Sequence, residues 1–370
     1  MRANRRQLLP GERIRVLIVD DSVVIRRLLV RSLSDHPLIE VVDTAANGVL
    51  ALERAAQLAP DVITLDIEMP EMTGIEVLRH LRSTRTAVRV VMFSTLTERG
   101  ASMTLEALAL GADDYVTKST AAFSDASPVT AIQQLLIPKI LQFFRAPGEE
   151  SEQMTVPAPA KPIVAPLQPH QAIFSSPKAV LIGTSTGGPT ALSEILPQFP
   201  EDFPWPVLIV QHMPPLFTRL LAERLNSNCS LQVAEASQGT SVSKGRVLIA
   251  PGDYHMKLAK MNGQIGIELD QSPPQNYCRP AVDVLFHSAA DVYGGAVIAV
   301  ILTGMGHDGC RGAGILKANG ARILAQDEAS SVVWGMPGAV ANAGIADRVL
   351  ALNEIVPELT RIARRSESSI

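Results

Sequence analysis

The chain has 370 residues, of which 46% are hydrophobic and 19% charged, a balance that suits two globular domains and excludes a disordered chain. Its 33 basic and 37 acidic residues nearly cancel, which excludes the basic field that nucleic-acid binding requires. The three cysteines form no Cys-x-x-Cys pair, so we expect reduced thiols. With no apolar run of about 18 residues and no secretory signal, we expect a cytoplasmic protein that does not insert into membranes.

The first half of the chain alternates short apolar segments with amphipathic ones. Predicted strands are the apolar runs 14–19, 39–43, 61–66, 88–93 and 114–117. Predicted helices carry apolar residues at helical spacing and lie at 23–33, 48–58, 74–82, 101–110 and 128–144. Strands that alternate with helices in this way predict a parallel sheet with helices on both faces.

A proline-rich stretch then interrupts the alternation. Residues 146–177 hold seven prolines, interspersed with Gly, Ser, Glu and Ala. Because proline lacks an N–H donor and stiffens the chain, we expect a semi-extended linker here. We therefore predict an N-terminal extension at 1–13, a first domain at 14–145, the linker at 146–177 and a second domain at 178–365.

The alternation of strands and helices resumes after the linker. Predicted strands lie at 178–183, 206–211, 246–250, 296–302 and 321–325. Predicted helices lie at 188–197, 215–226, 281–292, 309–319 and 335–344. The fold class is therefore α/β, with two doubly wound parallel-sheet domains joined by a proline-rich linker.

Polar residues stand at the ends of the first domain's predicted strands: Asp20 with Asp21, then Asp66, Ser94 and Lys118. Ligands bind outside the carboxyl ends of such strands. Gathered carboxylates need a cation, for which Mg²⁺ is suited, and a carboxylate can accept a phosphoryl group. The Ser94 hydroxyl could then bond a phosphoryl oxygen and Lys118 could pair with its charge. Taken singly, Asp20 and Asp21 could instead cap the following helix.

Residues 14–120 resemble a response-regulator receiver domain, which has a flavodoxin-like fold. The resemblance rests on these residues, on Met-Pro three residues after Asp66 and on Gly74 at a helix start. It implies that Asp66 is phosphorylated and that Asp20, Asp21 and Asp66 surround Mg²⁺. The family usually has proline after the lysine, where this chain has Ser119.

The second domain begins with a serine in a strand-to-helix turn. Residues 183–188 read Gly-Thr-Ser-Thr-Gly-Gly, directly after the apolar run 179–182. Such a turn exposes Ser185 at the edge of the sheet and directs backbone N–H groups toward a developing oxyanion. Gly/Ser/Thr-rich turns of this kind also bind phosphate groups, so the motif alone leaves both functions open.

A nucleophilic serine needs a base, and four histidines of the second domain are candidates. His212 follows the strand 206–211, and His255 also stands near a strand end. His287 lies in an apolar helix, where a satisfied structural histidine is the better interpretation. His307 lies in a Gly-rich loop.

The base in turn needs a carboxylate that orients it. Asp308 is favoured because it closely follows the strand 296–302. An aspartate before glycine also suits a plain turn. Asp253 and Asp283 remain rivals that the pattern does not exclude.

Residues 178–360 resemble the catalytic domain of chemotaxis protein-glutamate methylesterases of the CheB type, a Rossmann-like three-layer esterase domain. The carrying motifs are Gly-Thr-Ser-Thr-Gly-Gly-Pro at 183–189, Gln-His-Met-Pro at 211–214, Ala-Pro-Gly-Asp-Tyr-His at 250–255, Arg-Pro-Ala-Val-Asp at 279–283, Thr-Gly-Met-Gly-His-Asp-Gly at 303–309, Gln-Asp-Glu at 326–328 and Trp-Gly-Met-Pro at 334–337. The resemblance implies that Ser185 is the nucleophile, His212 the base and Asp308 the orienting acid. Backbone N–H groups near Thr186 and Met305 would hold the oxyanion.

The same resemblance implies that the chain hydrolyses glutamate γ-methyl esters on methylated chemoreceptors and releases methanol. Whether it also deamidates receptor glutamines stays open. A chemotaxis histidine kinase would supply the phosphoryl group, and phosphorylation with Mg²⁺ would relieve inhibition by the receiver. The esterase reaction itself would need no cofactor. Two alternatives stay open: a receiver-regulated esterase for small molecules, and a response regulator without catalysis that acts by docking.

Overall fold

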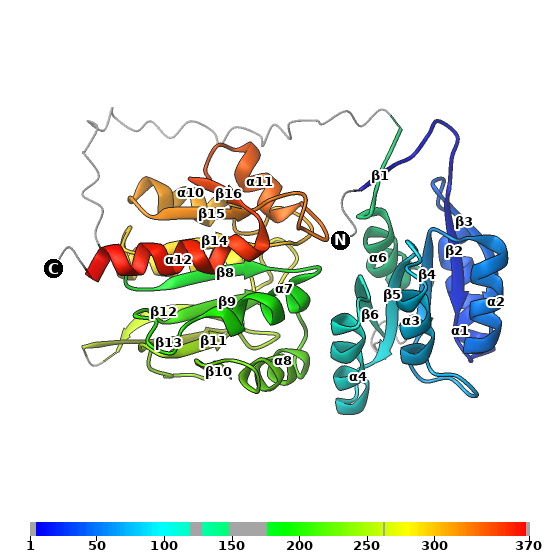
Figure 1. The fold of residues 1–370 in the computed structure, drawn as a ribbon, viewed down its shortest axis with the longest axis horizontal. Coiled ribbons are helices and arrows are strands. Elements are labelled where there is room, and N and C mark those ends of the chain that lie inside the picture. Colours follow the sequence, from blue (N-terminus) through cyan, green and yellow to red (C-terminus); the bar gives the residue numbers. More distant parts are fainter. Residues whose placement is uncertain (1–4, 119–127, 148–175, 262, 368–370) are drawn as a thin grey trace. The chain divides into compact units, whose positions relative to one another are not determined.

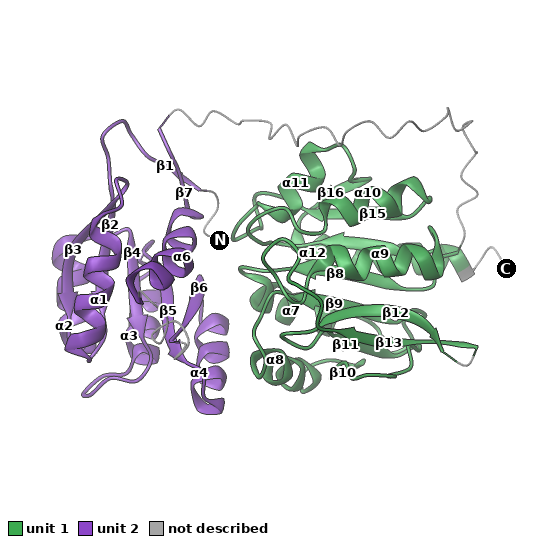
Figure 2. Cartoon of the chain, turned by 180° about the vertical axis from the view of Figure 1, so that it is seen from behind, with its two compact units in different colours: residues 1, 150–370 green, residues 2–149 purple. Residues whose placement is uncertain are grey.

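A computed structural model describes residues 5–118, 128–147, 176–261 and 263–367 of the chain. The chain divides into two compact units, one within residues 2–149 and the other within residues 150–370 (Figures 1 and 2). Among the described residues, no helix combines the length and apolar character that crossing a membrane requires. Most of the predicted linker lies outside the described residues.

The sheet of the first unit is parallel, with the strand order β3-β2-β4-β5-β6. Its strands are β2 (Ile14–Val19), β3 (Ile39–Ala45), β4 (Val62–Asp66), β5 (Arg89–Thr95) and β6 (Asp114–Lys118). Its helices are α1 (Val23–Ser34), α2 (Gly48–Leu58), α3 (Gly74–Ser83), α4 (Glu98–Ala109) and α6 (Pro128–Leu141). Helix α1 packs beside α6, while α3 packs between α2 and α4. The predicted parallel α/β fold is confirmed, and its strand order reverses between β2 and β4.

Short polar side chains begin the helices that follow the sheet's carboxyl edge. Ser22 accepts a hydrogen bond from the N–H of Ile25 and caps α1. Thr73 and Glu76 bond each other's backbone N–H groups at the start of α3, which is a capping box. These caps fix where α1 and α3 begin after β2 and β4.

Part of the N-terminal extension is a strand, which the sequence did not predict. Strand β1 (Arg6–Gln7) pairs in parallel with β7 (Phe144–Arg145), close to the start of the predicted linker. Leu8 is buried, and Arg6 forms ion pairs with Glu12 and Asp61 at 2.7 and 3.1 Å. Two-residue strands are too short to show an alternating pattern, so only the pairing reveals them.

The sheet of the second unit has seven parallel strands in the order β10-β11-β9-β8-β14-β15-β16. The strands are β8 (Val180–Thr184), β9 (Val207–Gln211), β10 (Gln232–Glu235), β11 (Arg246–Ile249), β14 (Ile298–Ile301), β15 (Arg322–Gln326) and β16 (Arg348–Leu350). Every residue of β8 is buried, as a central strand covered on both faces requires. Because β9 and β14 lie on opposite sides of β8, the order of the sheet reverses at this strand.

Helices cover both faces of this sheet in a three-layer arrangement. They are α7 (Gly188–Ile195), α8 (Phe217–Asn226), α9 (Val282–Tyr293), α10 (Cys310–Ala318), α11 (Met336–Asn342) and α12 (Leu352–Glu367). Helix α10 packs between α9 and α11, while α7 packs against both α8 and α12. The doubly wound fold predicted for this half of the chain is confirmed.

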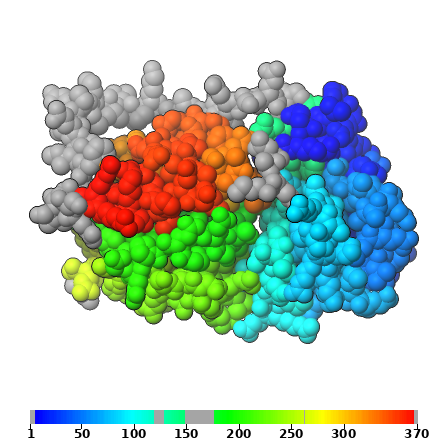
Figure 3. Space-filling view, viewed as in Figure 1, coloured from blue at the N-terminus to red at the C-terminus, as the bar shows by residue number. Residues whose placement is uncertain are grey.

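Several elements of the second unit escaped prediction. Strands β12 (His255–Met261) and β13 (Gln264–Asp270) form an antiparallel hairpin beside the parallel sheet. Strands β10 and β16 are too short to show a clear pattern. Helix α12 was not predicted because it contains Pro357, and proline disfavours the interior of a helix. Helix α12 nevertheless buries apolar residues at helical spacing, and Figure 3 shows its outer face exposed at the surface.

Candidate active site

The carboxyl edge of the second sheet gathers the serine, histidine and aspartate that the motifs singled out. Ser185 directly follows β8 and His212 directly follows β9, which pairs with β8. Asp308 lies in the loop between β14, on the other side of β8, and α10. Ligands of open parallel sheets bind where the strand order reverses, and Ser185 stands at that point.

The Ser185 backbone is fixed by the neighbouring strand ends. Its N–H donates to the Thr303 carbonyl at 3.0 Å, and the Gln211 side chain donates to the Ser185 carbonyl at 2.9 Å. Ser185 is half-buried at this edge. The left-handed residue of the turn is Gly187, with φ 79°, rather than the serine itself. The turn therefore differs in detail from the strained serine of the nucleophile elbow.

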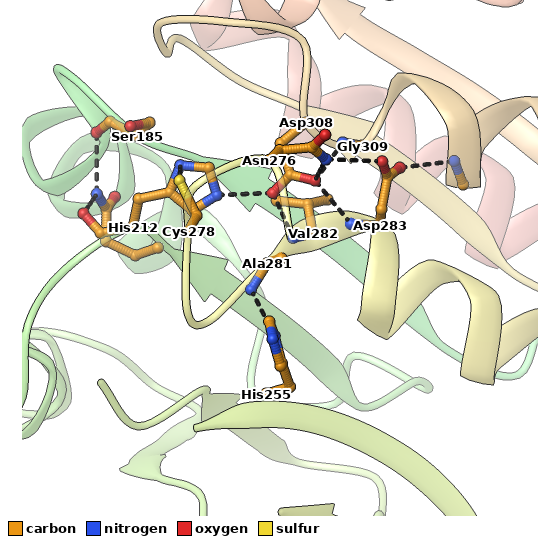
Figure 4. Close-up of polar contacts among 12 residues, drawn as sticks. Ser185, His212, His255, Asn276, Cys278, Ala281, Val282, Asp283, Asp308 and Gly309 are labelled. Atoms are coloured by element: carbon orange, nitrogen blue, oxygen red, sulfur yellow. Dashed lines mark hydrogen bonds and ion pairs between the residues drawn. The ribbon is translucent and has the colours of Figure 1, made fainter. Parts of the chain in front are cut away.

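His212 is half-buried and pairs with the buried Asp308, with Nε2 of the histidine 2.8 Å from Oδ2 of the aspartate (Figure 4). Asp308 is 2% exposed and accepts backbone N–H bonds from Val282, Asp283 and Gly309 at 2.6–3.1 Å. Burial by itself raises the pKa of Asp308, but the bonds from His212 and from the backbone outweigh it and lower that pKa. Asp308 is therefore a carboxylate, and Nε2 of His212 carries the proton between them.

The environment of His212 favours its charged form. Burial alone lowers the pKa of His212, but the hydrogen bonds with Asp308 and Cys278 outweigh burial and raise that pKa above its usual value. Because Nε2 bonds Asp308, the nitrogen that remains to accept a proton is Nδ1. Figure 4 shows Ser185 and Asp308 on opposite sides of the imidazole. No hydrogen bond joins the Ser185 hydroxyl to His212 among the described residues, and such bonds commonly tighten only with substrate.

The remaining histidines of this unit lie in other settings. His255 is buried, accepts the N–H of Ala281 at Nδ1 and bonds the Pro273 carbonyl through Nε2, so both nitrogens hold the backbone. His287 was expected to be satisfied, and this was wrong for Nε2, which is buried without a partner in the described chain. His307 is exposed in the loop before Asp308. Of these four histidines, His212 is the one bonded to a carboxylate.

The two rival carboxylates also bond elsewhere. Asp253 forms an ion pair with Arg279 at 2.5 Å. Asp283 is buried at the start of α9 and accepts the N–H of Gly312 at 2.7 Å. Its pKa is raised, chiefly by burial. The choice among three aspartates, which the sequence left open, is thus decided by geometry in favour of Asp308 as the partner of His212.

Two residues near the pair went unnoticed in the sequence. The Asn276 amide donates to Asp308 at 2.8 Å, and the Cys278 sulfur lies 3.5 Å from Nδ1 of His212. They precede the Arg-Pro motif in a stretch without helical or strand periodicity, and that stretch offered no signal of its own. Thr186 is buried next to Ser185, and Met305 is exposed beyond β14. Their part in holding an oxyanion stays a prediction.

The first unit presents an acidic cluster at its own switch point. Oxygens of Asp20, Asp21 and Asp66 lie within 4.8 Å of one another, with Asp21 exposed and the other two buried. Lys118 bonds Asp20 at 2.8 Å and Asp66 at 2.7 Å. Burial raises the pKa of Asp66 to about 6, although Lys118 opposes that rise. When all four groups are ionised, the three carboxylates and the Lys118 ammonium carry a net charge of about −2. This oxygen-rich, negatively charged set fits Mg²⁺.

Ser94 lies at the end of β5 but bonds away from Asp66. Its hydroxyl donates to the Gly100 carbonyl at 3.1 Å and accepts from the Thr104 hydroxyl at 2.7 Å. A contact with a phosphoryl group on Asp66 would require this side chain to give up those bonds. Ser119, where relatives usually have proline, lies outside the described residues.

The comparisons with known proteins agree with this arrangement. A family model described as a response regulator receiver domain matches residues 16–124, and one described as CheB methylesterase matches residues 180–359. A protein-glutamate methylesterase/protein-glutamine glutaminase from a Nocardioides species is 49% identical over 98% of this chain and 98% of its own length. The chain belongs to the CheB methylesterase family.

Further CheB-family relatives extend the match. A protein of the same description from Trichodesmium erythraeum is 46% identical over 94% of this chain and 99% of its own. The crystal structure of the Thermotoga maritima CheB methylesterase catalytic domain is 47% identical and covers 51% of this chain and all of that one, with a TM-score of 0.50. The family resemblance seen in the motifs is therefore confirmed: this CheB-family chain is a methylesterase with a receiver domain. The roles of individual residues stay predictions.

Proposed function

We propose that this chain hydrolyses glutamate γ-methyl esters on methylated chemoreceptors, with Ser185 as nucleophile, His212 as base and Asp308 as orienting acid. The observation that supports these roles most is the His212–Asp308 pair at the strand edge that also carries Ser185. The proposed substrate follows from relatives described as protein-glutamate methylesterases and protein-glutamine glutaminases. Deamidation of receptor glutamines would use the same acyl chemistry.

The proposed reaction has two halves. The Ser185 oxygen attacks the ester carbonyl carbon while its proton passes to Nδ1 of His212, since Nε2 is held by Asp308. The bond to the methoxy group then breaks, and methanol leaves with that proton. In the second half water attacks the acyl-serine and gives a proton to His212, which passes it to the Ser185 oxygen as the acyl bond breaks, and the released glutamic acid ionises to the carboxylate. Backbone N–H groups near Thr186 and Met305 would stabilise the oxyanion.

The receiver would control this reaction through Asp66. We propose that a chemotaxis histidine kinase supplies the phosphoryl group, that Asp20, Asp21 and Asp66 hold Mg²⁺, and that Lys118 and Ser94 contact the phosphoryl oxygens. The ion, when bound, would neutralise the cluster and accept phosphoryl oxygens as ligands. The proposed domain limits remain 14–145 for the receiver and 178–365 for the catalytic domain.

Methanol release from methylated receptor membranes tests the proposed function. Ser185→Ala in the full chain should reduce kcat by a factor on the order of 10⁶, because a triad serine and its base act as one unit. Ser193→Ala is a matched control, since this α7 hydroxyl bonds the Pro189 carbonyl within its own helix. It should release methanol at the wild-type rate.

The same assay separates the alternatives. Turnover of short-chain esters without methanol release from receptors would point to a small-molecule esterase and reject the proposed substrate. Equal hydrolysis by wild type and Ser185→Ala would reject catalysis by this site and favour a docking function. Ammonia release from unmethylated receptors that carry glutamine would test deamidation separately.

A further inference from the structure

The segment just before the Arg-Pro motif is a tight two-residue turn. Gln275 and Cys278 exchange both backbone hydrogen bonds, at 2.8 and 3.1 Å. The two residues between them, Asn276 and Tyr277, are left-handed, with φ 50° and 62°. Such turns prefer Asn and Gly at these positions, and Tyr there is strained. We call residues 275–278 the active-site turn.

The first left-handed residue of the active-site turn bridges two buried carboxylates. The Asn276 amide donates to Asp308 at 2.8 Å and to Asp283 at 3.0 Å. These aspartates are 2% and 4% exposed, and the charge of each disfavours ionisation of the other. An amide group with two N–H donors can bond both carboxylates at once without adding charge. Asn276 thereby reinforces the position and the ionised state of the carboxylate that bonds His212.

The last residue of the active-site turn reaches the other side of the imidazole. The Cys278 sulfur lies 3.5 Å from Nδ1 of His212, whereas Asp308 bonds Nε2 (Figure 4). In the charged form that this environment favours, the Nδ1–H of His212 donates to the Cys278 sulfur, and in the neutral form Nδ1 offers the lone pair that accepts a proton. Among the described residues, Asp308 and Cys278 are the titratable groups that bond this ring. The thiol thus contacts the nitrogen that would take the Ser185 proton.

We propose that the active-site turn is a positioning element for the esterase: Asn276 holds Asp308 in place, and Cys278 holds Nδ1 of His212 until the Ser185 hydroxyl replaces the thiol there. This inference rests on the proposed function. Neither residue touches the substrate in this scheme. A single turn thereby fixes both members of the His212–Asp308 pair, because Asn276 contacts Asp308 and Cys278 contacts His212.

Three single variants of the full chain test the proposal. Asn276→Gly suits the left-handed backbone but lacks the amide, and should lower kcat on the order of ten- to a hundredfold with little change in KM. Cys278→Ala removes the thiol that raises the pKa of His212, so the acid limb of the pH profile should move to lower pH. Cys229→Ala is the matched control, because this half-buried cysteine lies between α8 and β10, outside the active-site turn. It should keep the wild-type rate and pH profile.

Imidazole NMR gives a readout that does not depend on turnover. With Ser185→Ala as the background, Cys278→Ala should shift the His212 titration to lower pH, and Cys229→Ala should leave it in place. Wild-type kcat in Asn276→Gly, or an unmoved His212 titration in Cys278→Ala, would overturn the corresponding half of the proposal. An active Ser185→Ala enzyme would instead reject the proposed function, and the titration would still test the turn. Equal thermal melting of the variants would establish that each remains folded.

Discussion

The His212–Asp308 pair illustrates how neighbours select one carboxylate among several. Asp308 accepts three backbone N–H groups and the Asn276 amide in addition to His212, so its charge is well compensated. An ionised buried carboxylate without such donors would be strongly disfavoured. These donors come from the start of α9, from the Asp308–Gly309 turn and from the active-site turn. A sequence pattern does not show that these donors converge on one carboxylate.

The raised pKa of His212 predicts how activity depends on pH. As a base, His212 must be neutral, and the protonated form predominates below its pKa. The kcat/KM for ester hydrolysis should therefore rise with pH and reach half its plateau above 6.5, the usual value for histidine. A profile measured with an unphosphorylated chain tests this, and a midpoint below 6.5 would contradict the raised pKa.

The same shift predicts a trend in stability. A pKa that is higher in the folded than in the unfolded chain means that protonated His212 stabilises the fold. This contribution is fully present below pH 6.5 and is lost as the pH rises through the folded pKa. His212→Gln should flatten that part of the curve when unfolding free energies of the catalytic unit are measured against pH. An unchanged curve would show that His212 contributes nothing there.

At the scale of elements, the strand-end loops of the second unit interlock. Thr303 accepts the N–H of Ser185 through its carbonyl and donates its hydroxyl to the Thr186 carbonyl at 2.9 Å. Gly304, next to it, lies so close that a Cβ there would stand 2.9 Å from the Ser185 Cβ and 2.4 Å from the Met336 sulfur. Glycine at this position therefore permits the close approach of two loops.

Gly304→Ala should accordingly disturb the serine turn. The serine backbone is held by neighbouring strands, so we expect a loss of about 1–3 kcal/mol in unfolding free energy and at least a tenfold fall in kcat. Gly314→Ala, inside α10, is the control, because its new Cβ would meet Ile345 at an ordinary 3.6 Å. It should keep full activity and gain roughly 0.5–1 kcal/mol in stability. Wild-type hydrolysis by Gly304→Ala would show that the contact is not needed.

At the scale of the whole molecule, the two units apply one topological rule to different chemistry. Each sheet reverses its strand order near its centre, between β2 and β4 in the first unit and at β8 in the second. The acidic cluster and the Ser185 turn stand at these two places. The crevice outside such a reversal is open because the adjoining loops lead to opposite faces of the sheet.

Phosphorylation of Asp66 should therefore change the activity of the catalytic unit. A small phosphodonor with Mg²⁺ should raise the methanol release of the wild type and leave Asp66→Asn without response. Asp43→Asn is a suitable control, since this half-buried β3 carboxylate pairs with Arg54 outside the cluster. A chelator should abolish the response but spare basal hydrolysis. Equal stimulation of Asp66→Asn would refute control through this aspartate.

Local sequence was sufficient for the strands, for most helices and for the family. Apolar runs and the polar residues that end them are contiguous, so Asp20, Asp66, Ser185 and His212 could be placed at strand ends in advance. Elements that depend on distant partners were missed, as with β1, which pairs with β7 only across more than a hundred residues.

The choice of Asp308 and the contacts of the active-site turn required the tertiary structure. The sequence does not distinguish Asp253, Asp283 and Asp308, because the residues next to an aspartate do not indicate which hydrogen-bond donors it will contact in the fold. Asn276 and Cys278 act on residues 32 and 66 positions away, in loops that only the packed sheet brings together. Charge compensation inside a fold depends on groups far apart in the chain, and therefore appears only when the chain is packed.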